Sequence, residues 1–250
     1  MACITFGRSR LQRGKLKRHR HAVPYLAVVL AGRYSEAGDC GCHVVGPGDV
    51  LVHERFDAHM NDLLSSSVEL INLPIPRGAS LPCAGRVDDP DTIARLCESD
   101  LLSASRSVVD AFIPSDSQPT GWPAVLASQL KRLPSTNLGE WAEEHGLARA
   151  TISRGFKAVF GVSPSRYRAE QRTRQACAVL ENSAVPLAEL AAELGYADQS
   201  HMTRAVREMT DRPPSFWRTI RQTSSRPPGS YAIDPRIRAR RPTQRAEPRC

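Results

Sequence analysis

The stretch GYADQSHMTRAVREMTDRPPSFWR, residues 195–218, decides the fold of the carboxyl-terminal part of this chain. A glycine turn precedes a short polar run, the run opens an arginine-bearing helix, and two prolines follow that helix. Short polar residues before an apolar-periodic segment are typical of a helix start, and proline favours the first turn of a helix. The stretch therefore predicts a turn, a helix and the beginning of another helix.

A looser copy of the same pattern occurs upstream, in GLARATISRGFKAVFGVSPSRYR, residues 146–168. If the second copy holds one extra residue, the alignment pairs these residues: Glu140 with Glu189, Gly146 with Gly195, Arg154 with Arg204, Pro164 with Pro214, and Arg168 with Arg218. Self-similarity of this kind indicates two copies of one structural unit. Each unit is predicted to be a helix, a glycine turn and a second helix, over residues 138–160 and 187–210, followed by a proline-started helix.

The residues of the first copy account for its folding. Asn137 can cap the first helix with Glu140 at the third helical position, as in a capping box, and Gly146 supplies the turn to the second helix. Apolar residues at helical spacing form the faces that we expect to pack together: Leu138, Trp141 and Ala142 against Ile152, Phe156 and Val159. In the second copy the inward positions of the second helix fall on Met202, Val206 and Met209.

The opposite faces of these two helices carry small and long polar residues: Ala150, Ser153, Arg154 and Lys157 in the first copy, and Gln199, Thr203, Arg204 and Arg207 in the second. Small residues let a helix approach a groove, while arginine and glutamine can bond to guanine and adenine edges in bidentate fashion. These side chains are our candidates for contact with double-stranded DNA. The alternative is a pair of ordinary amphipathic helices with solvated outer faces, and the repetition in register favours DNA binding.

The helix that starts at Ser163-Pro164 is expected to run to about Leu180 and to join the two units. At about 1.5 Å per residue it would be roughly 25 Å long. With the width of the units, such a strut can place the two base-reading helices about one DNA turn, near 34 Å, apart. One chain would then read two successive major grooves.

The amino-terminal part has a different texture. From Tyr25 to about Pro76, short apolar runs are cut by turn-forming residues, which predicts β-strands in a small barrel or sandwich. After Asp88 the apolar spacing becomes helical, and a Pro/Ser/Gly break at 114–121 is the expected domain linker. The predicted fold class is a two-domain α+β protein, with a small β-barrel plus helices followed by an all-α domain.

The ends of the chain and its charge bear on the class of protein. The net charge is +8, and arginine and lysine concentrate at both ends. Between the ends, residues 22–137 are acidic and residues 138–221 are mildly basic. Residues 1–21 and 222–250 lack apolar periodicity, so we expect a disordered basic arm and a disordered basic tail. The seven cysteines show no paired spacing, and no apolar run is long enough to cross a bilayer. We therefore expect a cytoplasmic protein with no membrane partner.

The motifs GYADQSHMTRAVREMTDRPPSFWR and ISRGFKAVFGVSPSRYR resemble the AraC/XylS family of transcription regulators. The resemblance covers residues 122–221 and implies a DNA-binding domain with two helix-turn-helix motifs that binds promoters and recruits or obstructs RNA polymerase. Carried over by position, it implies base-reading roles for Ala150, Ser153, Arg154, Gln199, Ser200, Thr203 and Arg204. This chain departs from the family pattern at Val206, where phenylalanine is usual, and at Thr210-Asp211, where the pair usually ends in glycine.

The segment 22–118 is similar to the cupin-like sensor domains of that family. His19, His21 and His59 follow the order of metal-cupin histidines, but Tyr25 stands near the place of the acidic ligand. Because a cupin metal needs converging ligands, we expect these histidines to be structural or to line, with Tyr25, a pocket for an organic effector. We expect no metal ion and no other cofactor.

The leading hypothesis is a transcription regulator that responds to a small molecule and is not an enzyme, with the helical stretch 91–112 as the candidate homodimer surface. The alternative is a metal-dependent cupin enzyme fused to a DNA-binding domain. A methyl-accepting DNA-repair function would need four cysteines arranged as a zinc site, and the spacing of positions 40, 42, 83 and 97 does not suit it.

Overall fold

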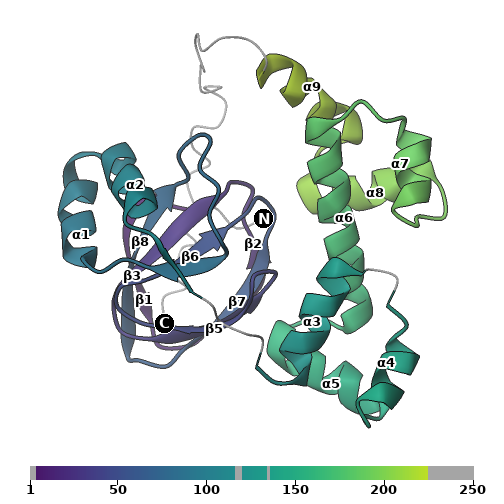
Figure 1. The fold of residues 1–250 in the computed structure, drawn as a ribbon, viewed down its shortest axis with the longest axis horizontal. Coiled ribbons are helices and arrows are strands. Elements are labelled where there is room, and N and C mark those ends of the chain that lie inside the picture. Colours follow the sequence, from purple (N-terminus) through teal and green to yellow (C-terminus); the bar gives the residue numbers. More distant parts are fainter. Residues whose placement is uncertain (1–3, 116–119, 134–135, 225–250) are drawn as a thin grey trace, which may run out of the picture.

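The computed structural model describes residues 4–115, 120–133 and 136–224. Two antiparallel sheets with two helices form the amino-terminal domain, and a bundle of helices forms the carboxyl-terminal domain (Figure 1). The predicted two-domain α+β class is confirmed. In the described parts of the chain, every helix is too short or too polar to cross a membrane.

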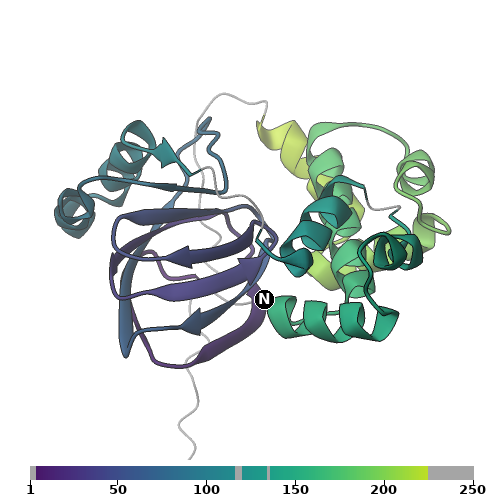
Figure 2. The ribbon, with the colours of Figure 1, turned by 60° about the horizontal axis from the view of Figure 1, so that its bottom comes forward.

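The strands form two separate sheets, whereas we expected a small barrel. The larger sheet has the order β1-β8-β3-β6-β9-β10; its strands are β1 Gly7–Gln12, β3 Tyr25–Ala31, β6 Asp49–His53, β8 Ser67–Pro74, β9 Ala84–Arg86 and β10 Ile113–Pro114. The smaller sheet has the order β2-β7-β4-β5; its strands are β2 Lys15–Arg20, β4 Tyr34–Gly38, β5 Gly41–Val45 and β7 Ala58–Leu63. The two sheets lie face to face (Figure 2).

Alternation along the strands of the larger sheet supplies two cores. One face of β3, with Ala27 and Val29, packs against residues of the smaller sheet such as Tyr34 and Leu63. The other face packs under the helices α1 Pro90–Ser99 and α2 Leu101–Asp110, which contribute Ile93, Ala104 and Val108. Because both faces of β3 are covered, the strand reads as a nearly continuous apolar run.

The expectation of a disordered arm over residues 1–21 is wrong for the part of it that the structure describes. β1 pairs with β8 in antiparallel fashion, and β2 pairs with β7. β1 carries two arginines, and β2 carries lysine, arginine and histidine. Both strands lie at sheet edges, where backbone hydrogen bonds to the neighbouring strand hold them. Such a strand shows no apolar periodicity in its sequence, and the absence of that periodicity was the reason for expecting disorder.

The carboxyl-terminal domain is entirely helical. Its helices are α3 Trp122–Arg132, α4 Leu138–Glu144, α5 Arg149–Phe160, α6 Pro164–Asn182, α7 Leu187–Glu193, α8 Gln199–Thr210 and α9 Pro214–Ser224. α3, α4 and α5 gather at one end of α6, and α7, α8 and α9 gather at the other (Figure 1). Two helix-turn-helix units joined by a long helix are therefore present, as the repeat predicted.

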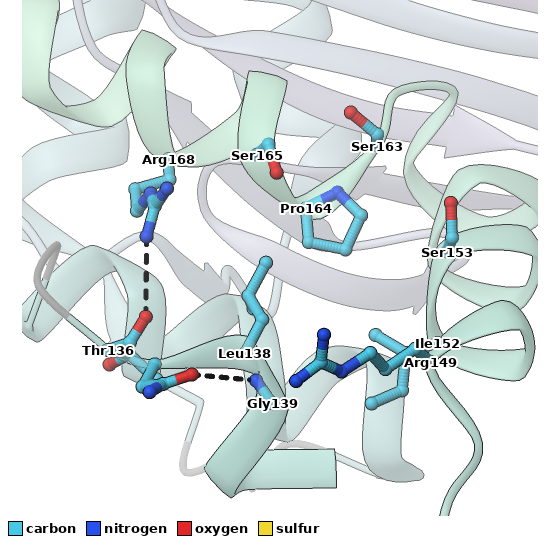
Figure 3. Close-up of a pocket in the computed structure, with 11 residues that line it drawn as sticks. Thr136, Leu138, Gly139, Arg149, Ile152, Ser153, Ser163, Pro164, Ser165 and Arg168 are labelled. Atoms are coloured by element: carbon cyan, nitrogen blue, oxygen red, sulfur yellow. Dashed lines mark hydrogen bonds between the residues drawn. The ribbon is translucent and has the colours of Figure 1, made fainter.

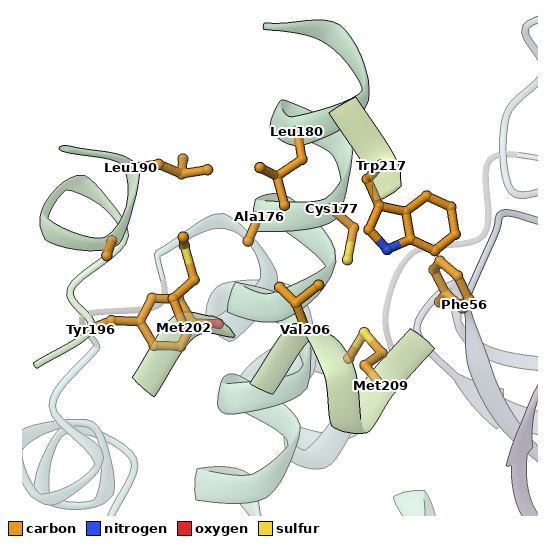
Figure 4. Packing of buried hydrophobic residues seen from close by; sticks show 11 residues of the cluster. Phe56, Ala176, Cys177, Leu180, Leu190, Tyr196, Met202, Val206, Met209 and Trp217 are labelled. Carbon is orange, nitrogen blue, oxygen red and sulfur yellow. The ribbon is translucent and has the colours of Figure 1, made fainter. Parts of the chain in front are cut away.

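Each unit has its own core. Trp141, Ile152 and Phe156 are buried in the first, with Leu138 and Val159 packed at its edge. Met202, Val206 and Met209 are buried in the second, where Phe56 of the amino-terminal domain packs edge-on against Trp217 (Figure 4). The expected inward faces of the two repeats are confirmed.

Two predictions of flexible segments concern residues that lie partly outside the described part of the chain. The linker expected over 114–121 includes residues 116–119, and the tail expected over 222–250 includes residues 225–250, which the structure does not describe. Within the described part, α9 continues through Ser224.

Candidate functional site

The first helix-turn-helix unit is fixed by its caps. The Asn137 side chain accepts hydrogen bonds from the Gly139 and Glu140 backbone amides at 2.9 and 3.4 Å, and its amide donates to the Glu140 carboxylate at 2.8 Å. The capping role expected for Asn137 is therefore present. α5 ends at Gly161, which adopts the left-handed conformation that closes a helix.

The second unit carries its side-chain cap on its second helix, because α7 has no side-chain cap and α8 has one. The Asp198 carboxylate accepts a hydrogen bond from the His201 backbone amide at 2.7 Å and so caps α8. α8 ends at Asp211, which is also left-handed, with φ 57°. The polar run before α8 thus begins the helix, and Asp211 occupies the position that Gly161 fills in the first unit.

Two arginines that the sequence alignment pairs make equivalent contacts. Arg168 of α6 donates a hydrogen bond to the Thr136 carbonyl at 3.3 Å, just before α4. Arg218 of α9 donates to the Val185 carbonyl, just before α7. Each arginine therefore ties the helix that follows a unit to the beginning of that unit, which makes the repeat structural as well as sequential.

The outer faces of α5 and α8 carry the candidate DNA-contacting residues. The exposed members of this set are Ala150, Ser153, Arg154, Lys157, Gln199, Ser200, Arg204 and Arg207. Thr203 is half-buried. The structure thus leaves these faces open to solvent with both domains present, and it places them near opposite ends of α6 (Figure 1).

A groove of about 570 Å³ lies beside the first recognition helix, between α4, α5 and the start of α6 (Figure 3). Arg149, Ser153 and Arg168 line it, together with Ser163 and Ser165. The sequence analysis missed Arg149. This residue begins α5 and does not belong to the set of outer-face residues that the helical spacing selected. Its guanidinium and the helix N-termini at this groove suit the phosphates of a nucleic acid.

The second groove, about 560 Å³, lies between α6 and α8. Arg204 lines it beside Glu208, and Glu208 pairs with Arg166 of α6 at 3.0 Å. The lining of this groove holds five arginines and two glutamates, whereas the first groove is lined by two arginines and no carboxylate.

A buried network of charges joins the amino-terminal domain to α6. Arg18 of β2 lies 2.9 Å from both Asp39 and Glu170, and Arg20 lies 2.9 Å from Glu170. On the same helix, Arg174 pairs with Asp39 and with Asp57. We call Arg18, Arg20, Asp39, Asp57, Glu170 and Arg174 the interdomain charge cluster. Buried charges persist only when paired, so this cluster fixes how α6 sits on the sheet.

The structure brings together the four residues expected to line an effector pocket. The ring of His19 lies 4.4 Å from that of His59 and 5.0 Å from that of His21. The Tyr25 ring lies 5.2 Å from His21, and its hydroxyl lies 3.5 Å from His59 Nε2. His21, Tyr25 and His59 are buried, and His19 is half-buried.

Two buried residues that sequence reasoning missed adjoin this group. His53 at the end of β6 stacks on Tyr25, and its Nε2 lies 3.8 Å from Glu36 Oε1 on β4. Alternation could have found Glu36, because it shares the inward face of β4 with Tyr34. Burial raises the pKa of Glu36 to about 8 and lowers the pKa of His53 to about 3. Burial also holds the pKa of His59 well below its usual value.

Comparison with known proteins identifies the helical part. Residues 141–220 match a model of the helix-turn-helix domain. The HTH-type transcriptional regulator ExsA of Pseudomonas aeruginosa is 33% identical over 70 residues, which cover 28% of this chain and 25% of ExsA. The virulence regulon transcriptional activator VirF of Yersinia enterocolitica is 31% identical over 70 residues, covering 28% of this chain and 26% of VirF. The chain thus spans about a quarter of the length of these curated relatives, which are transcription regulators and not enzymes.

Among solved structures, fatty-acid-bound ToxT of Vibrio cholerae covers 86% of this chain and 94% of its own, with 11% identity and a TM-score of 0.38. That likeness is too weak to carry an inference. The repeat of the two units and the match over residues 141–220 together identify the domain. Residues 141–220 of this chain form a helix-turn-helix domain, and the chain is similar over 70 residues to the transcription regulators ExsA and VirF.

Proposed function

We propose that this protein is a sequence-specific transcription regulator that binds double-stranded promoter DNA through α5 and α8 and acts on RNA polymerase in the cytoplasm. The observation that carries the proposal is the division of both helices into a buried apolar face and an exposed face with arginine at matched positions, Arg154 and Arg204. The DNA-binding domain would extend over 122–221, because α3 packs with α5 and α6 in the first unit.

The test is a binding measurement on selected DNA. Sequences bound by the full chain are first enriched from a random library, and affinities are then measured by fluorescence anisotropy at fixed salt, because phosphate contacts make affinity salt-dependent. Arg154→Ala and Arg204→Ala are each expected to weaken specific binding by roughly 1–3 kcal/mol, about 5- to 150-fold, if each arginine reads a base. Arg13→Ala, at an exposed site in the turn between β1 and β2, is the matched control and should leave affinity unchanged.

The proposal would be wrong if both variants bound the selected DNA as tightly as the parent protein. Helix content and thermal unfolding like those of the parent would show that the variants are folded. An equal loss of affinity for selected and random DNA would mean that the arginines contact phosphates instead of bases.

We also propose that a small-molecule effector in the amino-terminal domain controls the helical domain, and that α1 and α2 supply a homodimer contact. The support lies in β2, where residues alternate in direction. Arg18 and Arg20 pair with Glu170 of α6, whereas His19 and His21 lie in the ring cluster with His59. A ligand that moves the histidines therefore acts on the same strand that holds α6.

A further inference from the structure

The buried residues Glu36, His53 and His59 meet between the two sheets, on three different strands. One ligand atom from each can be chosen so that all three atoms lie within 4.8 Å of one another. The residues are exposed by only 3%, 2% and 4%, respectively. Nothing in the proposed DNA-binding function uses this cluster.

The hydrogen bonds around the cluster are incomplete. His59 Nδ1 is buried and has no hydrogen-bond partner within the described part of the chain. The 3.8 Å between His53 Nε2 and Glu36 Oε1 is too long for a hydrogen bond. A buried polar atom without a hydrogen-bond partner costs free energy, so a bound group that contacts this atom would explain the arrangement.

The separation of His53 and Glu36 suits an ion. Two ligands that each lie about 2.1 Å from one metal are at most about 4.2 Å apart, which includes the separation of His53 and Glu36. The second oxygen of Glu36 accepts a hydrogen bond from Asn61 Nδ2 at 2.8 Å, an outer contact that orients ligating carboxylates.

We propose that Glu36, His53 and His59 bind one divalent first-row transition metal ion. Two imidazoles and a carboxylate are a donor set that such ions take in proteins, whereas calcium and magnesium prefer oxygen alone. The set differs from the amino-terminal group His19, His21 and His59, which has no carboxylate and in which His19 Nδ1 already lies 2.8 Å from the Lys17 carbonyl. Sequence analysis predicted no metal because Tyr25 stands near the place of the acidic ligand, and it did not consider Glu36 or His53.

The test is cobalt(II) titration of the full chain after chelator treatment and desalting, followed by visible absorption and competed with zinc(II). We expect one equivalent of cobalt per chain, with d–d bands and without the near-ultraviolet charge-transfer band of thiolate ligands. Glu36→Gln and His53→Asn are each expected to weaken cobalt binding at least tenfold. His145→Asn, at an exposed site on the helical domain, should leave it unchanged.

Glu36→Gln keeps the shape of the residue and an oxygen that can accept the hydrogen bond from Asn61, so its fold is expected to persist and is checked by circular dichroism. Absence of saturable binding, a thiolate charge-transfer band, or loss of cobalt in His19→Asn with retention in Glu36→Gln would each overturn the assignment. The readout involves no DNA, so its failure leaves the regulator proposal untouched, and failure of the regulator proposal leaves the metal site untouched.

Discussion

At the scale of single residues, the two repeats differ most at the ends of their recognition helices. Gly161 and Asp211 both adopt left-handed backbone conformations, with φ of 74° and 57°. Glycine adopts this conformation without a steric penalty, whereas residues with a Cβ pay about 1–2 kcal/mol, less for aspartate than for most. The departure from the family pattern at Asp211 is therefore a local backbone strain in the second unit.

Asp211→Gly is expected to raise the free energy of unfolding by about 0.5–1 kcal/mol, because it relieves that strain and the gain exceeds the added freedom of the unfolded chain. Urea denaturation of the full chain measures the change. Gly161→Ala is the opposite variant, because its new Cβ would lie 3.1 Å from Arg18 Cβ in a conformation alanine disfavours. We expect it to destabilise the protein by about 1 kcal/mol or more. A decrease in stability for Asp211→Gly would contradict the strain interpretation.

At the scale of elements, α6 decides how the two units can meet DNA. It has 19 residues, and at about 1.5 Å each it is about 28 Å long. Arg168 of α6 ties that helix to the first unit, and Ala176, Cys177 and Leu180 of α6 are buried in the core of the second unit. The spacing between the units is thus set by a rigid helix and not by a flexible linker.

DNA with about five extra base pairs between the two contacted segments is expected to bind no better than a single unit, because half a helical turn moves the second groove to the far side. An insertion of about ten base pairs should not restore affinity, since α6 cannot extend to a second turn. Insertions of the same lengths outside the footprint serve as controls. Recovery with the longer insertion would show that the units move independently.

At the scale of the whole molecule, the interdomain charge cluster joins the strands of the amino-terminal domain to α6 of the helical domain. Arg18 and Glu170 are almost completely buried, with side-chain exposures of 8% and 7%. By contrast, Arg8 and Glu69 form a pair at the edge of the larger sheet with exposures of 58% and 28%. Removing one partner of a buried pair leaves the other charge without compensation, whereas exposed pairs contribute little.

Glu170→Gln is expected to destabilise the protein by about 3 kcal/mol, and a double-mutant cycle with Arg18→Met should show a coupling of about 2 kcal/mol. The matched cycle with Glu69→Gln and Arg8→Met should show less than about 1 kcal/mol. Urea denaturation supplies the free energies, and hydrogen exchange in α6 reports the docking of the helix. Equal couplings in both cycles would mean that apolar contacts such as that of Phe56 with Trp217 hold the domains.

The sequence by itself determined the helical domain, because its information is local and repeated. Caps and apolar spacing depend on residues within a few turns of one another, and the same local pattern occurs twice, with Arg154 in one copy and Arg204 in the other. The helices, their inner faces and their outer faces could therefore all be predicted. Whether those outer faces contact DNA stays a prediction.

Only the tertiary structure decided the two sheets, the role of β1 and β2, the interdomain charge cluster and the meeting of Glu36 with His53 and His59. Edge strands are held by backbone hydrogen bonds to distant partners, so their charged sequences resemble disordered tails. The buried clusters likewise join residues that pairing between strands brings together from separate parts of the chain. Because sheet register depends on long-range contacts, no local pattern in the sequence specifies it.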